Sequence, residues 1–205
     1  MNSDAQSARD DLAFLRAVVG DDEARQVRSF GEAYFAAGLI YGGQMLLHAG
    51  QALGWISGAP PYAIAIGLGP TVLFAPVLTW IILRSRKDAV HGTAGRAIAS
   101  VFAVVGIANL ALVAVIGAVA WREGSATTWL IYPCSVFVLQ GAAWLFAHMM
   151  RKRGWYLAVA AGWFACAVAM ALTVTQMGWF ILFAGAGLWL CMALPGWLML
   201  RQSRR

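Results

Sequence analysis

The sequence predicts an all-α polytopic membrane protein, with six transmembrane helices arranged as three hairpins after a short cytoplasmic N-terminal helix. Two observations predict this class. The chain of 205 residues is 61% hydrophobic and 12% charged, which is too apolar for a soluble domain of this length. Its 15 basic and 9 acidic residues all lie outside six apolar stretches. Each stretch has about the 20 residues that a helix needs to cross a bilayer core.

The six stretches define a transmembrane bundle over residues 33–200. We place the spans at 33–56, 62–83, 97–121, 128–149, 155–174 and 179–200. As a single helix, the last two would be about 69 Å long, more than twice a bilayer core of about 30 Å. The chain must therefore turn near Gln176, and six is the expected number of spans.

The first 32 residues form the one substantial polar segment, which we expect to be cytoplasmic and amphipathic. A capping-box pattern at Ser7 and a glycine stop at Gly20 predict a short helix. A second helix is expected from Asp21 and could continue into the first span. The apolar face of the short helix would carry Leu12, Leu15, Val18 and Val19. This face either lies on the bilayer or the cytoplasmic loops, or docks a cytoplasmic or membrane protein partner.

The basic residues lie almost entirely on alternate connections between the spans. They precede the first span, separate the second from the third and the fourth from the fifth, and follow the sixth in the tail 201–205. Lys and Arg accumulate in cytoplasmic loops, so both termini should face the cytoplasm. The net charge of +6 then reflects cations near lipid headgroups and does not indicate nucleic-acid binding. The excess of Arg over Lys, with abundant Ala and Gly, favours the bacterial inner membrane.

The first span combines a polar face with a glycine face. Its polar residues recur with three- and four-residue spacing on one side: Tyr34, Tyr41, Gln44, His48, Gln51 and Trp55. The adjacent side carries two GxxxG pairs, Gly38 with Gly42 and Gly50 with Gly54, which permit close approach of another helix. Such a helix is expected inside the bundle or at a homo-oligomer interface.

Four spans each place one polar side chain near the bilayer centre. By counting inward from the span ends, we locate Gln44, Thr71, Asn109 and Gln140 at matching depth. An unpaired amide in hydrocarbon costs several kcal/mol, so these groups are expected to meet. They either form interhelical hydrogen bonds that fix the fold or line a small polar pocket together with Tyr41, His48 and Gln51.

Charged and metal-binding chemistry is not predicted within the spans. The apolar stretches contain no Asp or Glu, which disfavours ion-coupled transport and acid–base catalysis. His48, His91 and His148 lie at different depths, and the three cysteines have no CxxC spacing, so we expect no metal and no cofactor. No nucleophile motif or phosphate-binding loop is present, and the sequence does not predict an enzyme.

The N-terminal segment Asp11-Leu12-Ala13-Phe14-Leu15-Arg16, followed by a charged linker and Trp-rich, Gly-rich spans, resembles a set of small bacterial six-helix inner-membrane proteins. That set has no established activity, so the resemblance implies the architecture alone. The first functional hypothesis is a non-enzymatic regulatory, sensory or assembly component that acts through protein–protein contacts. The alternative is a small uncoupled transporter or ligand-binding bundle with a neutral polar pocket at the membrane centre.

Overall fold

The computed structural model describes the backbone of residues 2–56, 60–85 and 93–203, and the side chains of residues 25, 27–56, 69–84 and 95–203. Within these ranges the chain is helical apart from short turns, and contains no strand. The all-α class predicted from composition is therefore confirmed. The segments long and apolar enough to cross a membrane are Gly95–Glu123, Ala126–Arg151, Gly154–Leu172 and Met177–Gln202.

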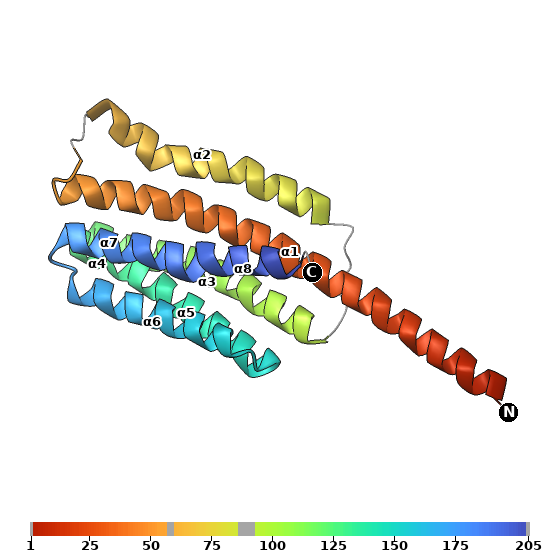
Figure 1. Ribbon diagram of the computed structural model, residues 1–205. Coiled ribbons are helices and arrows are strands. Elements are labelled where there is room, and N and C mark those ends of the chain that lie inside the picture. Colours follow the sequence, from red (N-terminus) through yellow and green to blue (C-terminus); the bar gives the residue numbers. More distant parts are fainter. Residues whose placement is uncertain (1, 57–59, 86–92, 204–205) are drawn as a thin grey trace.

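The first helix, α1, runs without interruption over Asn2–Ala52. The predicted start at Ser7 and stop at Gly20 are therefore wrong. A helical glycine costs about 1 kcal/mol relative to alanine, which long helical flanks can absorb. At about 77 Å, α1 is much longer than the bundle, and its N-terminal part projects beyond it (Figure 1). The side chains of Leu12, Leu15, Val18 and Val19 lie outside the described residues.

The end of α1 depends on Gly54, which has a φ of +74°. The amides of Trp55 and Ile56 both donate to the carbonyl oxygen of Gly50, at 2.8 and 3.1 Å. This is the glycine-terminated helix end that satisfies otherwise unpaired carbonyls. Gly54 thus ends the helix, which differs from its predicted role in helix packing. The side chain of Ile56 folds back against Gly50.

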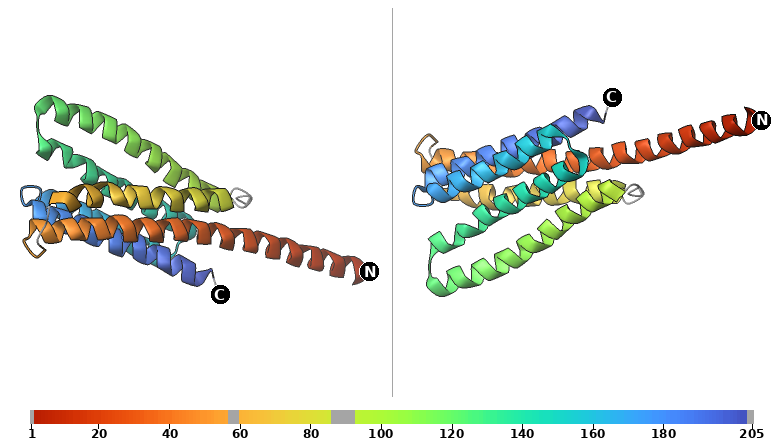
Figure 2. Two further views of the ribbon diagram at one scale, coloured as in Figure 1. Left: turned by 90° about the horizontal axis from the view of Figure 1, so that it is seen from above. Right: turned by 90° about the horizontal axis from the view of Figure 1, so that it is seen from below.

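The next two helices lie at the edge of the bundle. The α2 helix (Pro60–Ser85) packs beside α1, and α3 (Thr93–Glu123) packs against α5 (Ile131–Arg151). Only 6% of the most apolar window of α3 is buried, and Leu110 at its centre is 73% exposed. Figure 2 shows that α3 diverges from α1 toward the turn between α3 and α4 (Ala126–Trp129).

The C-terminal half forms the compact part of the bundle. The α5 helix turns at Lys152, which has a φ of 50°, into α6 (Gly154–Leu172). After a second turn, α7 (Met177–Leu188), η1 (Trp189–Ala193) and α8 (Leu194–Gln202) form one continuous rod (Figure 1). We call the end of the bundle that carries Arg84, Arg151 and Arg201 the basic end.

The segment η1 is a single π-helical turn, in which Leu194 donates its amide to the carbonyl of Trp189. Pro195 follows directly. Proline has no amide hydrogen, and its ring would clash with the carbonyl four residues earlier in a regular helix. A wider turn at this point accommodates the ring without breaking the rod.

Glycines bring α1 against this rod. A Cβ atom at Gly38 would overlap the backbone of Ala193, and one at Gly42 would overlap the ring of Trp189. From the other side, a Cβ atom at Gly196 would overlap the backbone of Phe35. The predicted close approach at Gly38 and Gly42 therefore takes place inside the chain. The core beside it contains Trp144, Trp163, Met170 and Pro195, each less than 2% exposed.

Candidate ligand-binding cavity

The structure distributes the seven predicted polar residues over several places. Tyr41 and Gln140 line one cavity, described below, whose lining includes none of the other five. Near the end of α1, Nδ1 of His48 lies 3.3 Å from Oε1 of Gln51. Gln44 is half-buried on α1, and Thr71 is exposed on α2. The Oδ1 atom of Asn109 is buried without a hydrogen-bond partner among the described residues.

The divergence of α3 from α1 (Figure 2) explains why Asn109 makes no hydrogen bond to the polar residues of α1 among the described residues. The rings of Phe30 on α1 and Phe102 on α3 meet near the basic end, with centroids 4.8 Å apart. Asn109 is two turns further along α3, where that helix moves away from α1 (Figure 2). Equal depth in a membrane places two residues at one level, but it does not make their helices neighbours.

Gln140 instead belongs to a hydrogen-bonded chain between α1 and α5. Nε1 of Trp144 donates to the hydroxyl oxygen of Tyr34 at 2.8 Å, and this hydroxyl donates to Oε1 of Gln140 at 3.0 Å. Tyr34 and Trp144 are 5% and 1% exposed. We call these three residues the relay. Hydrogen bonds in a dry interior hold their partners firmly, because an unmade bond there is costly.

The relay borders a partly open cavity of about 510 Å³. The cavity lies between α1, α2 and α5, with α6, α7 and η1 behind it. Its polar lining residues are Tyr34, Tyr41, Tyr132, Gln140 and Trp163. Its apolar lining residues are Ala33, Ala37, Met45, Phe74, Pro133, Val136, Phe137, Ala184, Leu188 and Met192. The volume is within the range of small-molecule sites, about 300–1,000 Å³.

The lining of this cavity is aromatic and uncharged. The Tyr41 ring meets Phe74 of α2 at 5.4 Å, and the Phe137 ring meets Trp163 of α6 at 4.7 Å, both edge to face. Trp163 is 1% exposed, and its indole nitrogen has no hydrogen-bond partner among the described residues. No Asp, Glu, Lys, Arg or His is among the lining residues. The cavity can therefore hold an apolar molecule and offer it a few polar contacts.

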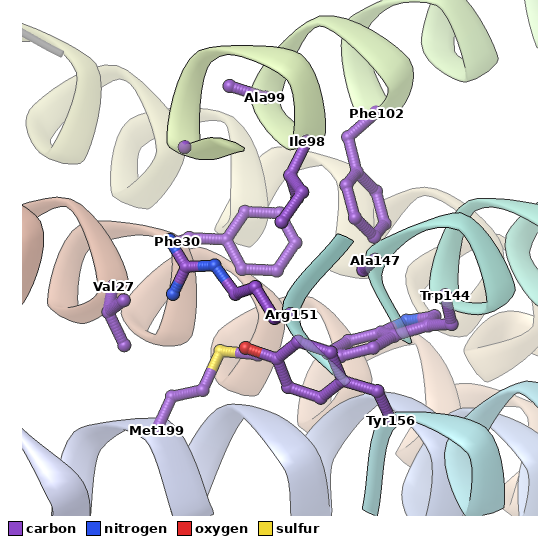
Figure 3. A pocket seen from close by; sticks show the side chains of 11 residues that line it. Val27, Phe30, Ile98, Ala99, Phe102, Trp144, Ala147, Arg151, Tyr156 and Met199 are labelled. Carbon is purple, nitrogen blue, oxygen red and sulfur yellow. The ribbon is translucent and has the colours of Figure 1, made fainter. Parts of the chain in front are cut away.

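A second, smaller pocket lies at the basic end and shares Trp144 with the relay. Figure 3 shows Phe30, Phe102, Trp144 and Tyr156 around it, with the side chain of Arg151 directed across. The volume is about 70 Å³, too small for a typical ligand. Tyr156 packs edge to face on Trp144 at 5.2 Å. This aromatic cluster holds Trp144 in the position from which it donates to Tyr34.

Sequence reasoning missed three residues of the site. Tyr34 lies on the predicted polar face of the first span, yet the residues of that span expected to line a pocket begin at Tyr41. Neither Trp144 nor Trp163 was predicted to belong to a site, because an indole far from the membrane interfaces usually packs as a large apolar group. A signal for Trp144 was present, since it lies four residues after Gln140 and hence on the same face of α5.

The remaining reactive side chains do not cluster around this cavity. Cys134, Cys166 and Cys191 are free thiols. Among the described residues, no group of three or more His, Cys, Asp or Glu side chains is close enough to hold a metal ion. Comparisons with protein-family models, with curated proteins and with solved structures found no match.

Proposed function

We propose that this chain is a six-span protein of the bacterial inner membrane, with both termini in the cytoplasm, that binds a small, uncharged and mainly apolar molecule. The site is the cavity of about 510 Å³ between α1, α2 and α5. The helices α1 and α2 would complete six spans in three hairpins together with the four helices of membrane-spanning length. The binding function was the alternative hypothesis from the sequence, and the cavity is the observation that now favours it.

Three features support a binding role for this cavity. Its volume suits a small molecule, and its walls come from six different segments, so that no single helix movement would close it. Its lining carries no ionised group, which matches an uncharged molecule that partitions from the bilayer. The relay holds one wall in a fixed arrangement, and rigid walls reduce the ordering that binding requires.

The test places a larger side chain on α5 so that it fills the cavity. Val136 lines it, whereas Val138, on the same helix, lines a different groove, between α3, α5 and α6. We expect Val136→Phe to weaken binding of radiolabelled dodecan-2-one to the purified protein in dodecyl maltoside by tenfold or more, because the new ring occupies the site. Val138→Phe is the matched control and should bind the probe as the unmodified protein does.

The outcomes are distinct. Equal binding to both variants would contradict a site in this cavity, and loss with Val138→Phe alone would move the site to the other groove. Circular dichroism and size-exclusion chromatography verify that both variants are folded. Absence of any binding to the unmodified protein would overturn the proposed function.

A second candidate function is the protein-contact role that the sequence first suggested. The projecting part of α1 favours it, because the N-terminal part of this helix extends past the bundle (Figure 1). Deletion of residues 1–20 should leave the thermal unfolding of the bundle unchanged and abolish co-purification of a cytoplasmic or membrane partner. Recovery of the same partner with the deleted protein would contradict this role.

A further inference from the structure

The hydrogen bonds of the relay indicate which side of the Gln140 amide is left for the cavity. An indole N–H can only donate, so Trp144 must occupy a lone pair of the Tyr34 hydroxyl. The single hydroxyl hydrogen of Tyr34 is then directed to Oε1 of Gln140. The amide oxygen of Gln140 is engaged by this bond. Its NH2 group makes no hydrogen bond to a described residue and is the polar group that Gln140 presents to the cavity.

A second donor lines the same cavity. The indole nitrogen of Trp163 is buried and lies beside the Tyr34 hydroxyl, but it makes no hydrogen bond of ordinary geometry to a described residue. An indole, like the NH2 of an amide, can donate but cannot accept, and Trp163 lines the cavity. A buried donor without a partner is costly, and a ligand that accepts a hydrogen bond from it removes that penalty. The two donors come from neighbouring helices, α5 and α6, and border one volume.

The complementary ligand is therefore an acceptor without a charge. A carboxylate or phosphate accepts hydrogen bonds strongly, but it would enter a cavity whose lining contains no cation. Burial of an unpaired charge is far more costly than two hydrogen bonds can offset. A ketone, quinone or ester carbonyl has the required acceptor and remains neutral. The aromatic and aliphatic walls suit an apolar body attached to that carbonyl.

We propose that Gln140 and Trp163 select uncharged lipid-soluble ligands through a carbonyl oxygen, with Tyr34 and Trp144 as positioning residues that hold the Gln140 amide with its donors toward the cavity. This inference rests on the proposed binding function and adds the chemical class of the ligand. It also assigns the relay a role in recognition beyond its role in packing.

Three probes of equal chain length separate the ligand classes. Dodecane has no acceptor, dodecan-2-one has a neutral acceptor and dodecanoate has a charged one. In dodecyl maltoside, which lacks carbonyl groups, we expect the ketone to bind about three- to tenfold more tightly than dodecane, the effect of one net hydrogen bond. Dodecanoate should bind no more tightly than dodecane. The infrared carbonyl stretch of the bound ketone should move to a lower wavenumber.

Variants of the donors then test their roles. Gln140→Leu and Trp163→Phe should each reduce the preference for the ketone toward that of dodecane and leave dodecane binding nearly unchanged. Tyr34→Phe releases the Gln140 amide to rotate and should reduce the preference with every donor still present. The matched control is Ser135→Ala, which removes a hydroxyl of α5 that lines the other groove and not this cavity, and which should keep the full preference and the full infrared shift.

The failures of the two proposals are distinguishable. If none of the probes binds, the proposed function fails. If dodecane and the ketone bind equally and the carbonyl band does not move, the cavity binds apolar molecules but the donor inference is overturned. Tightest binding of dodecanoate would also overturn it. Phosphatidylcholine added to the micelles separates two carbonyl sources. Displacement of the ketone would identify an ester of a bilayer lipid, and continued binding would identify a separate carbonyl compound.

Discussion

The third helix and the C-terminal rod have similar compositions but very different environments. The most apolar 18-residue window of α3 has a mean hydropathy of 2.5, and 6% of it is buried. The corresponding window of the rod formed by α7, η1 and α8 has a mean hydropathy of 1.9, and 39% of it is buried. The more apolar helix thus makes fewer contacts within the chain. In a bilayer, lipid tails are as apolar as leucine, so hydropathy alone does not bring helices together.

Small residues and hydrogen bonds account for the difference. The rod carries Gly185, Gly187 and Gly196, each of which lies so close to a neighbouring helix that a Cβ atom would overlap it. On α3, by contrast, Gly106 faces open space. The lesson is that apolar length determines which helices enter the membrane, and close-packing residues determine which of them form the core.

The largest expected effect comes from truncation of the core. Met170 on α6 is fully buried, and Met170→Ala should lower the free energy of unfolding by about 2–5 kcal/mol through lost contacts and a residual cavity. Leu110 on α3 is 73% exposed, and Leu110→Ala should change the free energy of unfolding by less than about 0.5 kcal/mol. Denaturation in mixed micelles measures both. Equal losses would show that α3 is covered in the folded protein.

A glycine pair on α1 tests close packing directly. Gly38→Leu must displace the backbone of Ala193, and should destabilise the fold by about 1–3 kcal/mol or more. Gly43 is five residues away on the same helix, and a Cβ atom there would have no neighbouring atom within 4 Å. Gly43→Leu should therefore be neutral or slightly stabilising. If both variants unfold at the same denaturant concentration, the interface between α1 and the rod does not depend on these contacts.

A tyrosine pair tests the relay. Tyr34→Phe leaves the Trp144 indole and the Gln140 amide oxygen without their partner, and should lower stability by about 1–3 kcal/mol. Tyr41→Phe, on the same helix, removes a hydroxyl for which the structure shows no hydrogen bond to a described residue. It should have an effect below about 0.5 kcal/mol in the absence of ligand. Thermal unfolding of the two variants, followed by circular dichroism, distinguishes these outcomes.

The smallest expected effect is a gain in stability from a substitution on α3. The Oδ1 atom of Asn109 is buried without a partner among the described residues, so Asn109→Leu should raise the free energy of unfolding by about 1 kcal/mol. A loss of stability upon this substitution would contradict the assignment and indicate that Asn109 pairs with a group outside the described residues. The same micellar denaturation assay measures the change.

Parts of the candidate site were predictable. Gln140 and Tyr41 were identified because polar residues are rare in apolar stretches, and both line the cavity. His48 and Gln51 were grouped with them because they share a face of the first span, but they pair with each other at the end of α1. Trp163 gave no signal, since an indole deep in a span usually packs as a large apolar group.

The sequence by itself predicted the helical class, the close approach at Gly38 and Gly42, and six spans, of which four are helices of membrane-spanning length among the described residues. These properties depend on composition, on segment length and on the absence of a side chain, all of which are local. The tertiary structure decided which helices are neighbours. The angle at which α3 leaves α1 (Figure 2) keeps these two helices from packing along their whole length, and the cavity beside the relay lies between α1, α2 and α5. Such angles arise from the summed packing of many side chains across several helices, so no single segment encodes them.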